Sequence, residues 1–250
     1  MLNGRLFDWD KHLWRLRRGL AALFIDGVMA DAALTQVARR LVAANGLADA
    51  LLYIQATRGA APRNHAFPAN APPNLILTVR RFDVAARLRD QARGVSCITL
   101  PDQRWARRDI KSTSLLPNVL AKEEARRAGA AEAVMVDGDG FVTEGSSTNM
   151  WMAAGGRIVT RPLSADILPG VMRDTLIALA RADGLAVEER AFTVAEAKAA
   201  DELFLTSTSM PVVPVVRLDD AALGDPGPVA RRCAALMWGE IGRQTGRARS

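Results

Sequence analysis

The 250-residue sequence predicts an α+β fold in two domains. Hairpin patterns alternate with helical patterns, whereas a purely parallel sheet would show a regular repeat of strand and helix. Hydrophobic residues make up 49% of the chain, enough for one large core or two modest ones. A polar, arginine-rich stretch separates two strand patterns. We therefore expect a first domain over residues 1–82, a linker over 83–90 and a second domain over 91–250.

The first domain is predicted to be a small α/β domain. Apolar residues recur at helical spacing from about Trp9 and again from Asp31 to Asn45, which predicts two amphipathic helices. The apolar runs ALLYIQATRG and LILTV predict two strands. Between them lies the polar, proline-rich segment GAAPRNHAFPANAPPN, which has too few apolar residues for a core. We interpret it as a loop, and such loops often carry binding residues.

The second domain is predicted to be larger, with a mainly antiparallel sheet or barrel flanked by helices. It begins with the strand VSCITL and continues with a helix, PNVLAKEEARRAG, that ends at Gly129. Strand patterns on either side of residues 137–140 and 155–156 predict two hairpins. A helix from near residue 169 to residue 184 and a strand pair in DELFLTSTS and VVPVVRLDD complete the pattern.

Composition argues against several classes of function. The formal charge is +6 and the pI is near 10.1, but the arginines lie beside acids or on helical stretches, where we expect a solvated face. Only 5% of the residues are aromatic, which leaves few platforms for stacking bases. No apolar run approaches the roughly 20 residues of a membrane helix, and no secretory signal is apparent. We therefore expect a cytoplasmic protein with no nucleic-acid or membrane partner.

The two cysteines, Cys97 and Cys233, cannot form a disulfide framework or a multi-thiolate metal site. We expect both to be small buried hydrophobic residues. No metal site is predicted from the sequence.

Three segments of the second domain hold chemically informative residues. Lys111, in DIKSTSLLPNVLAK, precedes an apolar helix; such a lysine is usually on the surface, but a buried one with a lowered pKa can attack an aldehyde. Glu144, in VTEGSSTNMWM, precedes Gly145 and a run of hydroxyls, which suits an ordinary turn or the close approach of a flat ligand. In ILPGVMRDTL, a helix start exposes the N–H groups of Val171 and Met172, which bind phosphate only if one points there.

Together these segments resemble the fold type IV pyridoxal-phosphate enzymes. That family comprises D-amino-acid aminotransferases, branched-chain aminotransferases and aminodeoxychorismate lyases. The resemblance is carried by DIKS at residues 109–112, TEGSSTN at 143–149, ILPGVMR at 167–173 and DELFLTSTS at 201–209. It covers nearly all of the chain, with the motifs in the family's order and at similar separations.

The resemblance implies a role for each motif. Lys111 would hold pyridoxal phosphate as a Schiff base and move the proton at the substrate α-carbon. Glu144 would keep the pyridine nitrogen protonated. Arg15, in DKHLWRL, is similar to the arginine of the family's H-x-x-R-L segment and shares a helix face with His12; its alternative is a solvated charge. The full set of residues expected to bind the cofactor is Arg15, Lys111, Glu144, Ser146, Ser147, Leu168, Val171, Met172, Ser207 and Thr208.

The first-domain loop favours one branch of the family. TRGAAPRNHAFP resembles the segment with which D-amino-acid aminotransferases bind the substrate α-carboxylate, and it places Arg63 and His65 at the binding positions. We expect transamination between D-amino acids, such as D-alanine, and 2-oxo acids, such as 2-oxoglutarate. Branched-chain aminotransferases, which are not expected to show this loop, are the second hypothesis and aminodeoxychorismate lyase the third. The resemblance also implies a homodimer.

One departure concerns the N-terminus. The family has an earlier strand with a tyrosine that contributes to the substrate pocket, and MLNGRLF resembles the turn after that strand. Tyr53, the single tyrosine, lies in a later strand and cannot be that residue. The expectation is either a start codon placed too late or a shortened protein with an unpaired sheet edge. The second reading adds a further hypothesis, a cofactor-binding protein with weak or no transaminase activity.

Overall fold

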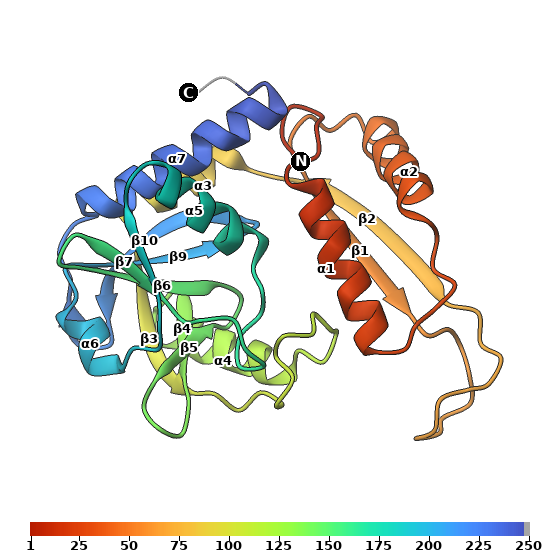
Figure 1. Ribbon diagram of the computed structural model, residues 1–250, viewed down its shortest axis with the longest axis horizontal. Coiled ribbons are helices and arrows are strands. Elements are labelled where there is room, and N and C mark those ends of the chain that lie inside the picture. Colours follow the sequence, from red (N-terminus) through yellow and green to blue (C-terminus); the bar gives the residue numbers. More distant parts are fainter. Residues whose placement is uncertain (248–250) are drawn as a thin grey trace. The chain divides into compact units, whose positions relative to one another are not determined.

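The computed structural model describes residues 1–247, which form two compact units. The first unit contains residues 1–83 together with 241–247, and the second contains residues 84–240. Figure 1 shows a mixture of helices and sheet in both units. The predicted α+β class is therefore confirmed.

The first unit is built on a two-stranded antiparallel sheet. Strands β1 (Ala50–Thr57) and β2 (Asn74–Arg81) pair along their whole length. Helix α2 (Asp31–Ala44) packs on this pair, because Leu34, Ala38 and Val42 recur every four residues and form one buried face. Helix α1 (Trp9–Ala22) buries Leu13 and Leu20. These four elements confirm the two helices and two strands predicted for this part of the chain.

The second unit contains one mixed sheet. Its strands, in the described part of the chain, are β3 (Val95–Pro101), β4 (Glu132–Val136), β5 (Val142–Gly145), β6 (Asn149–Ala154), β7 (Arg157–Thr160), β8 (Ala186–Glu189), β9 (Glu202–Ser207), β10 (Met210–Leu218) and β11 (Ala221–Ala222). The order is β5-β4-β3-β10-β9-β6-β7-β8, and β11 pairs with β10. The β3–β4, β3–β10 and β7–β8 pairs are parallel and the other pairs are antiparallel, as predicted for a mainly antiparallel sheet.

Five helices accompany this sheet in the described residues: α3 (Val84–Arg93), α4 (Leu116–Arg127), α5 (Val171–Ala182), α6 (Val194–Ala199) and α7 (Pro228–Thr245). Helices α4 and α5 confirm the predicted helices. Most of the stretch predicted as a linker, 83–90, instead belongs to α3, which packs on β10. The helices α6 and α7 and the short strands β8 and β11 were not predicted.

The core lies on both faces of the central strands. On β6, Met150 and Met152 join a buried cluster on one face, whereas Trp151 stacks on Phe204 of β9 with ring centroids 5.6 Å apart. Successive side chains of a strand point to opposite faces, so this arrangement requires cover on both sides of the sheet. The buried central strands give the neighbouring strand ends a rigid base.

Both cysteines of the chain lie in the interior of the protein. Cys97 and Cys233 are buried free thiols, and burial raises the pKa of both, that of Cys233 to about 12. Both therefore behave as the small buried residues predicted.

None of the helices within residues 1–247 combines the length and apolar character needed to cross a membrane.

Candidate active site

Glu144 is a buried carboxylate at the end of β5. Its side chain is 4% exposed and receives hydrogen bonds from three parts of the chain. The Leu168 N–H donates to both carboxylate oxygens at 3.1 Å, Asn149 Nδ2 donates to Oε2 at 2.9 Å, and Arg104 Nη1 donates to Oε1. Burial raises the pKa of Glu144 to about 7 in spite of the Arg104 charge. The carboxylate is therefore fixed in position yet short of compensating positive charge.

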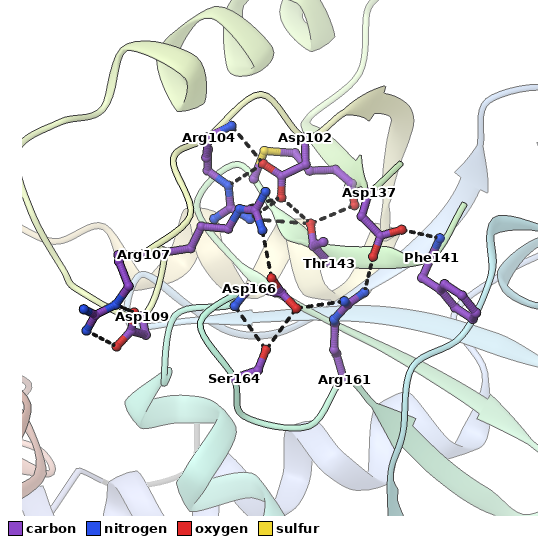
Figure 2. Close-up of polar contacts among 12 residues, drawn as sticks. Asp102, Arg104, Arg107, Asp109, Asp137, Phe141, Thr143, Arg161, Ser164 and Asp166 are labelled. Carbon is purple, nitrogen blue, oxygen red and sulfur yellow. Dashed lines mark hydrogen bonds and ion pairs between the residues drawn. The ribbon is translucent and has the colours of Figure 1, made fainter. Parts of the chain in front are cut away.

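Arg104 is itself held by a buried aspartate. Its Nε and Nη2 atoms donate to Asp102 at 2.9 and 2.7 Å, and the Thr143 hydroxyl donates to the same carboxylate at 2.7 Å (Figure 2). Burial alone would raise the pKa of Asp102, but hydrogen bonds from Arg104 and Thr143 hold it below its ordinary value. Arg104 thus reaches Glu144 as a permanent cation with a fixed orientation.

Lys111 lies in an irregular segment, residues 102–115, that precedes α4. Its side chain is exposed, whereas the preceding Asp109 and Ile110 are buried. Contacts before and after Lys111 in the chain reach the strand end, one from Arg104 of this segment and one from Asn118 in the first turn of α4. Arg104 contacts Glu144, and Asn118 Nδ2 donates to the carbonyl of Ser146 at 2.8 Å. The Lys111 segment and the strand end that carries Glu144 are therefore neighbours.

The start of α5 lies beside the same strand end. Leu168 donates its N–H to Glu144 and accepts at its carbonyl from Asn149 at 3.1 Å. The first N–H groups of any α-helix have no partner within the helix. At the start of α5 the N-cap residue, Gly170, has no side chain to accept from them. A Cβ at Gly170 would collide with Asn149, and one at Gly145 would collide with Thr148. Gly170 thus permits the close packing of α5 against the end of β5, and Gly145 permits the tight turn that follows β5.

The hydroxyls after Glu144 contact a second buried carboxylate, that of Glu132. Ser146 and Ser147 were expected to bind the cofactor, but their hydroxyls donate to Glu132, the latter at 2.8 Å, and Thr148 lies 3.4 Å from the same carboxylate. Glu132 is fully buried and forms an ion pair with Lys122 at 3.3 Å. In this structure the hydroxyls therefore hold the strand-end loop in shape.

Ser207 and Thr208 follow Thr206 of β9, which pairs with Asn149, whereas the remaining predicted site residues lie in the first unit. Ser207 is half-buried at the end of β9 and accepts from the Met210 N–H at 3.1 Å, and Thr208 is exposed in the following turn. Arg15 lies on α1 of the first unit, where burial lowers its pKa to about 10. Arg63 and His65 are exposed on the loop between β1 and β2, also in the first unit. Their roles stay predictions.

Sequence reasoning missed the residues that hold Glu144. Arg104 and Arg108 belong to RWARRD, which we interpreted as part of a solvated face, and this is wrong: their side chains are 7% and 13% exposed. Asn149 was noted only as the end of TEGSSTN. An available signal was the buried-strand pattern before TEG, because a carboxylate that ends such a strand needs nearby donors.

Comparisons with known proteins point to one family over most of the chain. A family model described as amino-transferase class IV matches residues 1–218. The D-alanine aminotransferase of Bacillus licheniformis is 39% identical over 97% of this chain and 86% of its own length. That of Staphylococcus haemolyticus is 38% identical over 92% of this chain and 82% of its own length.

Solved structures show the same fold. The branched-chain aminotransferase of the thermophilic archaeon Thermoproteus uzoniensis, solved with norvaline, superposes with a TM-score of 0.83 at 25% identity, covering 97% of this chain and 80% of that one. The branched-chain enzyme of Escherichia coli gives a TM-score of 0.87 at 23% identity, covering 98% and 82%.

Proposed function

The chain belongs to the class IV aminotransferases, and we propose that it exchanges amino groups between D-amino acids, such as D-alanine, and 2-oxo acids, such as 2-oxoglutarate. One observation carries the choice of substrate. The D-alanine aminotransferases are 38–39% identical over more than nine tenths of the chain, whereas these two branched-chain structures are 23–25% identical at similar coverage. The cofactor of this family is pyridoxal phosphate.

The second unit fits that cofactor at two points. Helix α5 begins without a side-chain cap, so the N–H groups of Val171 and Met172 and the positive end of the helix suit a phosphate. Glu144 is a buried carboxylate whose pKa is raised to about 7 by burial, and a protonated ring nitrogen beside it would supply the missing positive charge. Asn149 and Leu168 contact both features through the hydrogen bonds given above.

The chain's own residues would then divide the work. When bound, the cofactor supplies an aldehyde that accepts the amino group and a protonated ring that withdraws electrons from the substrate α-carbon. Lys111 would hold the cofactor covalently at Nζ and, as a free amine, would move the proton at the substrate α-carbon. Glu144 would keep the ring nitrogen protonated because an adjacent anion favours the charged form of a base.

The remaining contacts are proposed from the family motifs. Leu168 would pack against the ring. Phosphate contacts would come from the Val171 and Met172 amides, helped by Thr208 and the Arg15 guanidinium, with Ser146, Ser147 and Ser207 lining the site. Arg63 and His65 would bind the substrate α-carboxylate, a pairing that suits the planar fork of an arginine.

We further propose a homodimer, in which α4 contributes to the contact. Its first turns present the exposed apolar side chains Leu115, Leu116, Val119 and Leu120, each at least 50% exposed. Residues one turn apart share a helix face, so these four make one contiguous apolar surface. Such a surface is typical of a contact between subunits. The cytoplasmic location expected from the sequence stays a prediction.

A screen of amino donors in both enantiomeric forms tests the proposed function. With 2-oxoglutarate as acceptor, D-alanine should yield pyruvate, and L-leucine or L-valine should yield little 2-oxo acid. Reaction with the L-donors and not with D-alanine would instead support a branched-chain enzyme. Pyruvate and 4-aminobenzoate formed from aminodeoxychorismate, without transamination, would support the lyase. A bound cofactor that reacts with no amino acid would support the inactive cofactor-binding protein.

A further inference from the structure

A series of alternating carboxylates and guanidinium groups extends from Glu144 across the second unit. Beyond Arg104 and Asp102 it continues through Arg108, Asp166, Arg161 and Asp137, and we call these seven residues the charge ladder. The contacts are Arg108 Nε to Asp102 at 3.3 Å, Arg108 Nη1 to Asp166 at 3.1 Å, Arg161 Nη2 to Asp166 at 3.1 Å and Arg161 Nη1 to Asp137 at 2.8 Å. Figure 2 shows Asp166 and Arg161 facing one another, with Asp137 beyond.

The charge ladder joins three segments that each end at the proposed active site. Residues 102–110 lead to Lys111, and residues 161–168 lead to the Leu168 amide that donates to Glu144. The β4–β5 hairpin turns at Asp137, where the Asp137 carboxylate accepts from the Phe141 N–H at 2.9 Å. The second strand of this hairpin carries Glu144 near its end. Both ends of the ladder, Glu144 and Asp137, thus lie in one hairpin.

Arg108 connects two of these segments directly. Its side chain is 13% exposed and lies between Asp102, which is fully buried, and Asp166. Its main-chain N–H donates to the Ala165 carbonyl at 2.9 Å, so main chain and side chain contact the same loop. Within residues 1–247 the Nε atom donates no hydrogen bond, and its contact with Asp102 is therefore held by charge. A neutral side chain here would leave two carboxylates from different segments without their shared cation.

We propose that Arg108 is a positioning residue, which bridges Asp102 and Asp166 to hold the Lys111 segment against the loop that presents the Leu168 amide to Glu144. This inference rests on the proposed transamination for its effect on catalysis. Residues 102–115 form neither helix nor strand, so contacts with other segments must fix the position of Lys111. Small displacements of a reacting group far from the mutated residue can lower a rate by about a hundredfold.

The test compares Arg108→Met, Asp166→Asn and the double variant with Arg157→Met, which removes an exposed arginine of β7 from a 3.7 Å ion pair with Glu188. Hydrogen–deuterium exchange of peptides covering residues 102–115 is measured in the cofactor-free proteins. We expect faster exchange in both single variants and no change in the Arg157→Met control. In the loaded enzymes, kcat for D-alanine should fall by about tenfold to a hundredfold in Arg108→Met, with KM within about threefold.

The two changes should not add, because both break the same bridge, and the double variant should resemble Arg108→Met. Additive losses, or unchanged exchange and kcat in Arg108→Met, would contradict the proposal. Asp166 is 41% exposed, so Asp166→Asn is the milder change and gives the same comparison if Arg108→Met does not fold. If the wild-type protein transaminates no donor, the proposed function fails, and the exchange of the cofactor-free proteins still decides whether the bridge holds the segment.

Discussion

At the scale of single residues, Glu144 is subject to two opposing influences. Burial favours its neutral form, whereas Arg104 and the Leu168 N–H favour the anion, and burial prevails in the cofactor-free protein. Its ordinary pKa is 4.5, and its pKa in the fold is about 7. A second cation at this carboxylate, in addition to Arg104, would favour the ionised form of Glu144.

Stability of the cofactor-free protein should reveal this shift. Between pH 4.5 and about 7 the unfolded chain ionises Glu144 while the folded chain keeps its proton, so this residue lowers the free energy of unfolding as pH rises. The glutamine of Glu144→Gln does not ionise, so its contribution to stability does not change with pH. Measured by urea unfolding, the variant's stability relative to wild type should increase by up to about 3 kcal/mol from pH 4.5 to pH 8. A constant difference across this range would show that Glu144 titrates normally.

The substrate carboxylate provides a second prediction at this scale. Arg63→Ala and His65→Ala should each raise KM for D-alanine, by about tenfold to a hundredfold for the arginine, because a charged hydrogen-bonded pair is lost. Steady-state kinetics measure the effect. Arg40→Ala, an exposed arginine of α2, is the matched control and should leave KM unchanged. Equal KM values in wild type and both variants would remove these residues from substrate binding.

At the scale of elements, α7 depends on a carboxylate from the sheet. Glu202 of β9 accepts from the N–H groups of Val229 and Ala230, both at 2.8 Å, and so caps the first turn. The approach is close enough that a Cβ at Gly227 would collide with Glu202. An acidic group at this position also interacts favourably with the helix dipole. The cap therefore fixes where α7 begins.

Loss of this cap should be measurable. Glu202→Ala should lower the free energy of unfolding by about 1–3 kcal/mol, because the buried N–H of Ala230 and the part-buried N–H of Val229 lose their acceptor. Urea denaturation gives the value. Glu124→Ala, at an exposed position of α4, serves as the control and should change stability by less than about 0.5 kcal/mol. A Glu202 variant as stable as this control would show that water replaces the cap.

The elements also show what local sequence can and cannot predict. Helices with an apolar stripe, such as α2, and hairpins with glycine turns were predicted because their signals are local. Helix α3 buries only Val84 and is rich in arginine, so its sequence resembles a polar linker. Helix α7 was missed although Ala230, Cys233, Ala234 and Met237 are buried at helical spacing, a signal that was present. Strand β8 needs its parallel partner β7, whose paired residues lie 29 positions earlier in the chain, as with Arg157 and Ala186.

The candidate site divides in the same way. The motifs around Lys111, Glu144 and Val171 are contiguous in sequence, so a family resemblance identified them. The donors to Glu144 were not predicted, because Arg104 contacts Thr143 and Glu144, which lie 39 and 40 residues away in the chain and come close only in the fold. An arginine cluster in a sequence is therefore a poor guide to exposure when acids from other segments can pair with it.

At the scale of the whole molecule, the chain consists of two compact units that share one family match. Residues 1–83 with 241–247 form one unit and residues 84–240 the other, and proposed site residues occur in both. The class IV match extends across the boundary, from residue 1 to residue 218. The apolar surface of α4 adds the expectation of a second copy.

Light scattering after size-exclusion chromatography tests that expectation. The wild-type protein should have about twice the mass of one 26.9 kDa chain. Leu116→Glu, at a position that is 69% exposed in the single chain, should shift the equilibrium toward the monomer, because a charge would be buried in the contact. Leu163→Glu changes an exposed leucine outside α4 and should leave the mass unchanged. A dimer unaffected by Leu116→Glu would place the contact elsewhere.

The most direct measurement is the visible absorption of the purified, cofactor-loaded protein during addition of D-alanine and then 2-oxoglutarate. We predict a visible absorption band that bleaches with D-alanine and returns with the 2-oxo acid. The Lys111→Ala variant should lack this band, because the covalent attachment of the cofactor is lost. A band that persists in Lys111→Ala, or that responds to L-leucine and not to D-alanine, would contradict the account.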